Sequence, residues 1–202
     1  MPDAPERFVE WMGENVGFNP RSGKYSDALS LYVIDDFADA CGLMKERMET
    51  AYVRAEPNAD VTTLSATRNV DLVLWGPEAG DGVRQVQRGL ENKLILAAHG
   101  KARKNRLGDI IAFANHVHNA AEGAIAAGLI GVNISAEYAN PDPFAEGMNH
   151  PKPEAFGVFV FRYDGRREAS LVTEPPAPQP GDPLHYTTFM ERVVQQYEQR
   201  HQ

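Results

Sequence analysis

A chain of 202 residues, 43% hydrophobic and 24% charged, has the composition of a globular protein and is long enough for one hydrophobic core. Its formal net charge of −8 argues against a protein that coats nucleic acid by bulk electrostatic attraction, but it does not exclude a local site. No apolar run is long enough to span a bilayer, the N-terminus lacks the features of a secretory signal, and the single cysteine can form no internal disulfide. We therefore expect a cytoplasmic protein without a membrane partner, folded as a single domain over residues 1–202.

The N-terminal quarter of the chain predicts helices between residues 4 and 52. Asp3 is expected to cap the first of them, because Pro5 and Glu6 follow it at the spacing of a helix start. Ser26 or Asp27 is expected to cap a second, long helix that runs to about Tyr52. Apolar residues recur along that segment at helical spacing, at Leu29, Val33, Phe37, Ala40, Met44, Met48 and Ala51.

Asp36 falls at the edge of this apolar stripe. An acid on a buried edge is a candidate additional ligand for a metal site. The alternative is a partly exposed acid that pairs with a neighbouring base, as most acids do at protein surfaces.

The centre of the chain predicts strands. Residues 53–64 hold β-prone runs around a turn signal at Glu56-Pro57-Asn58, and residues 69–75 and 90–97 are strongly apolar strands. A helix over 106–121 and an apolar strand over 125–135 follow, which predicts a parallel crossover.

Two further strands are expected at 156–163 and 168–173, before a proline-rich connection over 174–183 that leads to a last helix. The order of elements predicts a mixed β-sheet flanked by helices, α/β or α+β in class.

Three ionisable side chains in the central strands suggest a site. Glu91 and Lys93 are two residues apart, so they leave the same face of their strand. Asp71 lies in the preceding strong strand, which would naturally pair with this one. Buried charges are costly unless they are paired or bind a metal. Two carboxylates with open water positions are typical ligands of Mg²⁺.

The bases of this acidic chain are concentrated beside the candidate site, because residues 92–108 hold five lysines and arginines and no acid. Residues 99–106 are expected to form a loop, with a tight turn at Gly100, between the strand and the helix that follows. With the free N–H groups of that helix they would make a phosphate-binding surface, or else only a solvated basic loop. The candidates are His99, Lys101, Arg103, Lys104 and Arg106.

Asp71 followed by Glu91-x-Lys93 on the next strand, with a long helix before and a helix–strand unit after, resembles the PD-(D/E)XK nuclease superfamily, which has the restriction-endonuclease-like fold. The resemblance covers roughly residues 27–135. Val70 stands where the motif name has Pro, a position at which the superfamily is loose. Carried over by position, the resemblance implies that Asp71 and Glu91 are metal ligands, that Lys93 is the catalytic lysine, and that the backbone carbonyl of Asn92 is a further metal ligand.

The function implied is that of a type II restriction-like DNA endonuclease that uses Mg²⁺, or Mn²⁺ in its place, to activate water. Its partner would be DNA, and a homodimer is the simplest way to cut both strands. The alternative is a non-catalytic DNA-binding or complex-assembly module that retains the fold. We expect metal binding at Glu91 to separate the two.

Overall fold

The computed structural model describes residues 2–15, 23–78, 80, 82–96, 99–135, 153–166 and 168–201. Eleven helices and strands lie in this part of the chain. They are α1 (Ala4–Glu14), α2 (Lys24–Ala40), α3 (Gly42–Glu49), β1 (Arg54–Thr62), β2 (Thr67–Glu78), β3 (Arg84–Ile95), α4 (His99–Ala120), β4 (Ile125–Asn133), β5 (Ala155–Tyr163), β6 (Ala169–Val172) and α6 (Tyr186–His201).

The described strands form one six-stranded sheet in chain order, β1-β2-β3-β4-β5-β6. The first three are antiparallel, β3, β4 and β5 are parallel to their neighbours, and β6 returns antiparallel to β5. The mixed sheet and the parallel crossover from β3 through α4 to β4 were both predicted from the sequence, and the structure confirms them.

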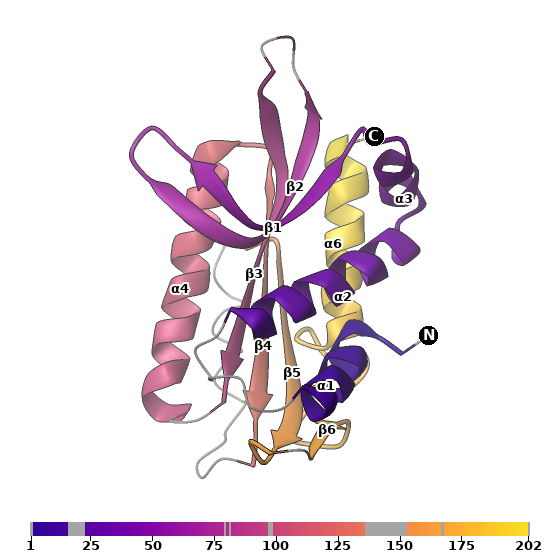
Figure 1. Cartoon of the computed structure of the whole chain (residues 1–202), viewed down its shortest axis with the longest axis vertical. Helices are drawn as coiled ribbons and strands as arrows, with labels where there is room; N and C mark the ends of the chain where they lie inside the picture. Colours follow the sequence, from indigo (N-terminus) through magenta and orange to yellow (C-terminus); the bar gives the residue numbers. More distant parts are fainter. Residues whose placement is uncertain are drawn as a thin grey trace.

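Helices cover both faces of the sheet (Figure 1). The largest core cluster joins apolar residues of α1, α2, α3 and α6 to one face, whereas α4 packs on the other face with Phe113 and Val117. Side chains of β3 alternate between the two layers, since Leu90 belongs to the first cluster and Ile95 to a cluster with Ile110 of α4. This alternation fixes the face on which each polar residue of β3 emerges.

Two glycines allow α4 to lie unusually close to the sheet. A Cβ at Gly89 of β3 would lie 2.8 Å from Val117, and a Cβ at Gly128 of β4 would lie 2.7 Å from Ile110. Both distances are too short for a real contact, so a side chain at either position would push α4 outward. The close approach brings Phe113 and Val117, in the C-terminal half of α4, over the centre of β3.

The single long helix predicted for residues 26–52 is wrong in detail, because the structure has two helices there. The chain leaves helical geometry at Cys41, with φ −122° and ψ 98°, and resumes it at Gly42. Glycine is a poor helix former, which makes this the weakest point of the segment. The apolar stripe continues across the break, since Phe37, Cys41 and Met44 are all fully buried.

The turn expected at Glu56-Pro57-Asn58 is also wrong. Strand β1 runs through these residues, and its register with β2 is constant from Arg54–Trp75 to Thr62–Thr67. The turn signal survives only as a local distortion, because Asn58 has a φ of +52°. In this register Asn58 stands opposite Asp71.

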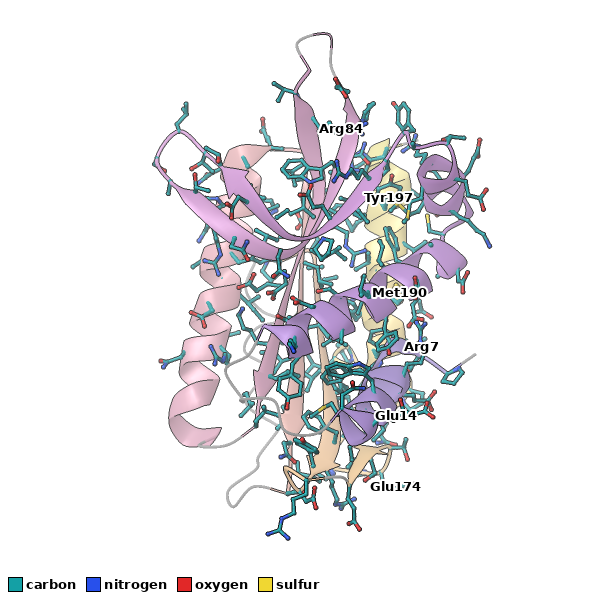
Figure 2. All side chains as sticks on the ribbon, viewed as in Figure 1. Arg7, Glu14, Arg84, Glu174, Met190 and Tyr197 are labelled. Carbon is teal, nitrogen blue, oxygen red and sulfur yellow. The ribbon has the colours of Figure 1, made fainter. Side chains whose placement is uncertain are left out.

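Arg88 of β3 points into the core and is 1% exposed. Its guanidinium lies 4.5 Å from the centre of the Phe37 ring, but none of its three nitrogens has a hydrogen-bond partner in the described part of the chain. Burial lowers the pKa of Arg88 to about 10. Nearby, Tyr197, labelled in Figure 2, donates to Gln87 Oε1 at 3.0 Å, and its oxygen accepts no hydrogen bond from Arg88. The contact with Phe37 offsets only part of the cost of burying this charge.

Replacing Arg88 with methionine is therefore expected to stabilise the protein. The substitution keeps most of the volume and removes an unpaired buried charge, so the free energy of unfolding should rise by about 1–3 kcal/mol in a urea titration. Arg84→Met is the matched control, because Arg84 on the same strand is part-exposed and donates to Gly76 O at 2.8 Å. A lower stability for Arg88→Met than for Arg84→Met would contradict this account of Arg88.

Candidate functional site

The candidate site lies where β2 and β3 part. The two strands pair from Leu74–Arg88 to Leu72–Leu90, and the same register places the next residues, Asp71 and Glu91, opposite each other. The ladder does not continue there. Instead the Asp71 carboxylate accepts a hydrogen bond from the backbone N–H of Asn92 at 2.7 Å. The side chain of Asp71 on β2 thus takes the place of a backbone hydrogen-bond acceptor for β3.

Lys93 lies between the two carboxylates. Its Nζ is 2.7 Å from Glu91 Oε1 and 3.7 Å from Asp71 Oδ2. The side chain of Glu91 is only 4% exposed and that of Asp71 14%, whereas that of Lys93 is 20% exposed. The structure therefore brings together the three residues singled out in the sequence, in a place that is largely shielded but open on the side of the lysine.

The electrostatic state of the site follows from its burial. The pKa of Asp71 is raised to about 6, first by loss of water and then by the neighbouring Glu91 carboxylate. Lys93 and the N–H of Asn92 act in the opposite direction, and Asp27 adds a smaller upward effect. Glu91 Oε2 is buried with no hydrogen-bond partner in the described residues. Two acids close together, one of them with an orphaned oxygen, form an environment that favours a cation.

Arg68 is a site residue that the sequence did not reveal. Its Nη2 lies 2.9 Å from Glu91 Oε1 and 3.3 Å from the backbone oxygen of Asp109 in α4. Arg68 stands three positions before Asp71 on β2, so strand alternation alone would place the two side chains on opposite faces. Their convergence depends on the distorted geometry of β1 and β2 around Asn58.

Asp27 in the first turn of α2 was expected only as a helix cap. The helix begins three residues earlier, at Lys24, so Asp27 does not cap it. Its carboxylate accepts a hydrogen bond from the side-chain amide of Asn58, and its charge acts on Asp71. Asp27 is therefore an additional acid close enough to the site to act on Asp71.

Asp36, the additional acid suggested by the sequence, has a different role. Its carboxylate accepts from the backbone N–H of Ala4 at 2.7 Å and from the hydroxyl of Tyr186 at 2.8 Å. It also pairs with Arg7, which is labelled in Figure 2. Asp36 thus ties α1 and α6 to α2, and it lies about 13 Å along the helix from Asp27 at 1.5 Å per residue. The prediction of Asp36 as a site acid is wrong, and the alternative of a paired acid is confirmed.

The basic segment after β3 is not a loop. Helix α4 begins at His99, so Gly100 lies in its first turn and makes no tight turn before it. The predicted phosphate-binding side chains of His99, Lys101, Arg103 and Lys104 lie outside the described residues. Arg106 is described. It pairs with the Asp109 carboxylate at 3.2 Å and is 41% exposed. Because Arg68 binds the backbone oxygen of Asp109, Arg106 is connected to the site through one residue.

The donor atoms at the site suit a hard divalent cation. Glu91 Oε2 accepts no hydrogen bond from the described residues, and Asp71 supplies a second carboxylate. The N–H and C=O of a strand residue point the same way, so the carbonyl of Asn92 also faces the gap left by β2. No group of three His, Cys, Asp or Glu suited to a metal is found among the described residues, so water would complete the coordination of an ion here.

Comparisons with protein-family models and with curated proteins find no match to this chain. Within the described ranges, every helix is too short or too polar to traverse a bilayer. Function has therefore to be inferred from the fold and from the geometry around Glu91.

Asp71→Asn is expected to stabilise the metal-free protein at neutral pH. A carboxyl whose pKa is raised in the folded state holds its proton more tightly there than in the unfolded state. The protein therefore loses stability as the pH rises from about 4 to above 6, and asparagine, which does not ionise, avoids this loss of stability. Urea titrations in the presence of a chelator should show a gain larger by on the order of 2 kcal/mol at pH 7.5 than at pH 4. Asp39→Asn is the control, since Asp39 is 52% exposed. A gain for Asp71→Asn that does not change with pH would contradict the raised pKa.

Proposed function

We propose that this protein is a Mg²⁺-dependent DNA endonuclease of the restriction-endonuclease-like type, which hydrolyses phosphodiester bonds. The observation that carries the proposal is the convergence of Asp71 and Glu91 on Lys93, at 3.7 and 2.7 Å. Two carboxylates and a lysine around one point are the groups that metal-assisted phosphodiester hydrolysis needs, and they come from two strands rather than from a single short motif.

The arrangement of elements around the site supports the same proposal. Helices α2 and α3, the antiparallel strands β1 to β3, helix α4 and the parallel strand β4 follow one another in the chain, and the three residues lie on β2 and β3. This is the order in which the resemblance to the PD-(D/E)XK superfamily places its acids and its lysine. The resemblance and the geometry are separate observations, and they point to the same residues.

In this proposal Asp71, Glu91 and the carbonyl of Asn92 hold the metal ion. When bound, Mg²⁺ or Mn²⁺ would offset charge on the scissile phosphate and favour deprotonation of the attacking water. Lys93 would hydrogen-bond that water and stabilise the hydroxide, since it is the most exposed of the three side chains at 20%. The shielded carboxylates would keep the reacting oxygen away from bulk solvent.

DNA would be held by the basic side chains that flank the site. Arg106 is 41% exposed and lies at the end of the basic stretch that forms the start of α4. A net charge of −8 limits this attraction to a local surface. The described part of the chain contains one such site, so we propose a two-fold dimer for cleavage of both DNA strands.

A non-catalytic DNA-binding or complex-assembly module is the second candidate. It is favoured by the charge balance of the site, where Arg68 and Lys93 already neutralise the two acids without a metal. The two proposals differ in metal binding. A binding module has no use for Mg²⁺ or Mn²⁺ at Glu91, so calorimetric titration with either ion separates them.

The proposed activity is tested with supercoiled plasmid DNA and Mg²⁺. Glu91→Gln and Lys93→Met should each lower the cleavage rate by about 100-fold or more, because each removes a group that acts on the transition state. Glu78→Gln is the matched control, since Glu78 lies on β2 but pairs at 4.0 Å with Arg84 at the far end of the strand. Equal cleavage by wild type and both site variants would show that these residues are not the catalytic ones.

A further inference from the structure

Arg68 makes contacts that a purely structural arginine would not need. Its Nη2 shares Glu91 Oε1 with Lys93, at 2.9 Å for the arginine and 2.7 Å for the lysine. The second contact of Arg68 is to a neutral group, the backbone oxygen of Asp109, and its guanidinium lies 6.0 Å from the centre of the Phe113 ring. Its side chain is 28% exposed. Among the described residues, Arg68 is thus held at the site by a single ion pair, with Glu91, and its side chain is partly exposed to solvent.

The charge balance changes when a divalent cation enters. Without metal, the carboxylates of Asp71 and Glu91 are matched by Lys93 and Arg68. Two added positive charges would leave the site over-compensated, and like charges at this distance repel. One of the two basic side chains must then weaken its ion pair with the carboxylates.

Of these two basic side chains, Arg68 is the one that can leave the carboxylates. Lys93 has a second carboxylate, that of Asp71, within 3.7 Å, whereas Glu91 is the sole acid paired with Arg68 in the described residues. Arg68 is also the more exposed of the two, at 28% against 20%. A guanidinium has the planar geometry that matches two oxygens of a phosphate. Arg106 pairs with the carboxylate of the same Asp109 whose backbone oxygen contacts Arg68.

We propose that Arg68 is an exchangeable counter-ion of the site. It pairs with Glu91 while no metal is bound, and it transfers to a phosphate of the DNA backbone once the metal takes its place at that carboxylate. Arg68 thereby couples metal binding to DNA binding. This inference rests on the proposed function of the same site.

The first test measures binding of Mn²⁺ alone by calorimetry. Arg68→Gln should bind Mn²⁺ about three- to tenfold more tightly than wild type, because a competing cation has been removed. Arg68→Lys keeps the charge and should bind Mn²⁺ like wild type, which separates loss of charge from a change of shape. Lys45→Gln is the control for net charge, since Lys45 pairs with Asp39 at 3.9 Å on the exposed surface of α3.

The second test measures binding of a short DNA duplex in the presence of Ca²⁺, a cation with the same preference for oxygen ligands, scored on uncut DNA. Arg68→Gln should bind the duplex about tenfold more weakly, and the salt dependence of its affinity should fall by about one phosphate contact. Arg68→Lys should keep most of the affinity. Opposite effects of one substitution on the two ligands are the signature of an exchangeable counter-ion.

Two failures are distinguishable. If wild type binds Mn²⁺ and DNA but Arg68→Gln binds Mn²⁺ no more tightly, or binds DNA as well as wild type, the role of Arg68 is overturned and the proposed function stands. If wild type binds no Mn²⁺, or Glu91→Gln binds it equally well, the proposed function and the role of Arg68 both fall.

Discussion

The end of the ladder between β2 and β3 is the constraint on which the site depends. A backbone N–H in a protein interior must find an acceptor, and the departure of β2 leaves that of Asn92 without one. The carboxylate of Asp71 fills this place at 2.7 Å. The bond draws an acid into a shielded position beside Glu91, which raises the pKa of Asp71 to about 6. Lys93 and Arg68 then offset charges that the fold has brought together.

The rest of the structure supports this arrangement from both faces. On one side, Gly89 and Gly128 let α4 come close enough for the backbone oxygen of Asp109 to reach Arg68. On the other side, the side chain of Asn92 donates to Ser30 of α2 at 2.8 Å, which holds the strand in place behind the site. Both supporting groups are on helices packed against the sheet, so the carboxylates are positioned by rigid elements rather than by loops.

Part of the site could be predicted because strand geometry has a simple period. Residues two apart on a strand share a face, so Glu91 and Lys93 were expected together, and a neighbouring apolar strand supplied Asp71. Arg68 and Asp27 could not be found in this way. Arg68 is three residues from Asp71, and Asp27 belongs to a helix whose docking depends on the whole core. The position of Asp36 at a buried edge was correct, but its partners on α1 and α6 are 32 and 150 residues away in the chain.

The errors in the fold come from local signals that tertiary packing overrides. Glycine at position 100 suggests a turn, yet the basic residues around it are good helix formers and α4 begins before them. A turn signal at Glu56-Pro57-Asn58 gives way to continuous pairing with β2, at the cost of a positive φ at Asn58. At the helix break at Cys41, the adjacent Gly42 is the one local signal in the sequence that indicates it. In each case the strand and helix types were predictable, and their ends were not.

The central claim is that one metal ion binds between Asp71 and Glu91. It is tested most directly by an anomalous difference map from crystals grown with Mn²⁺. The account predicts a peak about 2.1 Å from an oxygen of each carboxylate and from the carbonyl oxygen of Asn92, with Arg68 turned away from Glu91. A map without a peak there, in which both acids still pair with Lys93 and Arg68 at a saturating concentration of Mn²⁺, would contradict it.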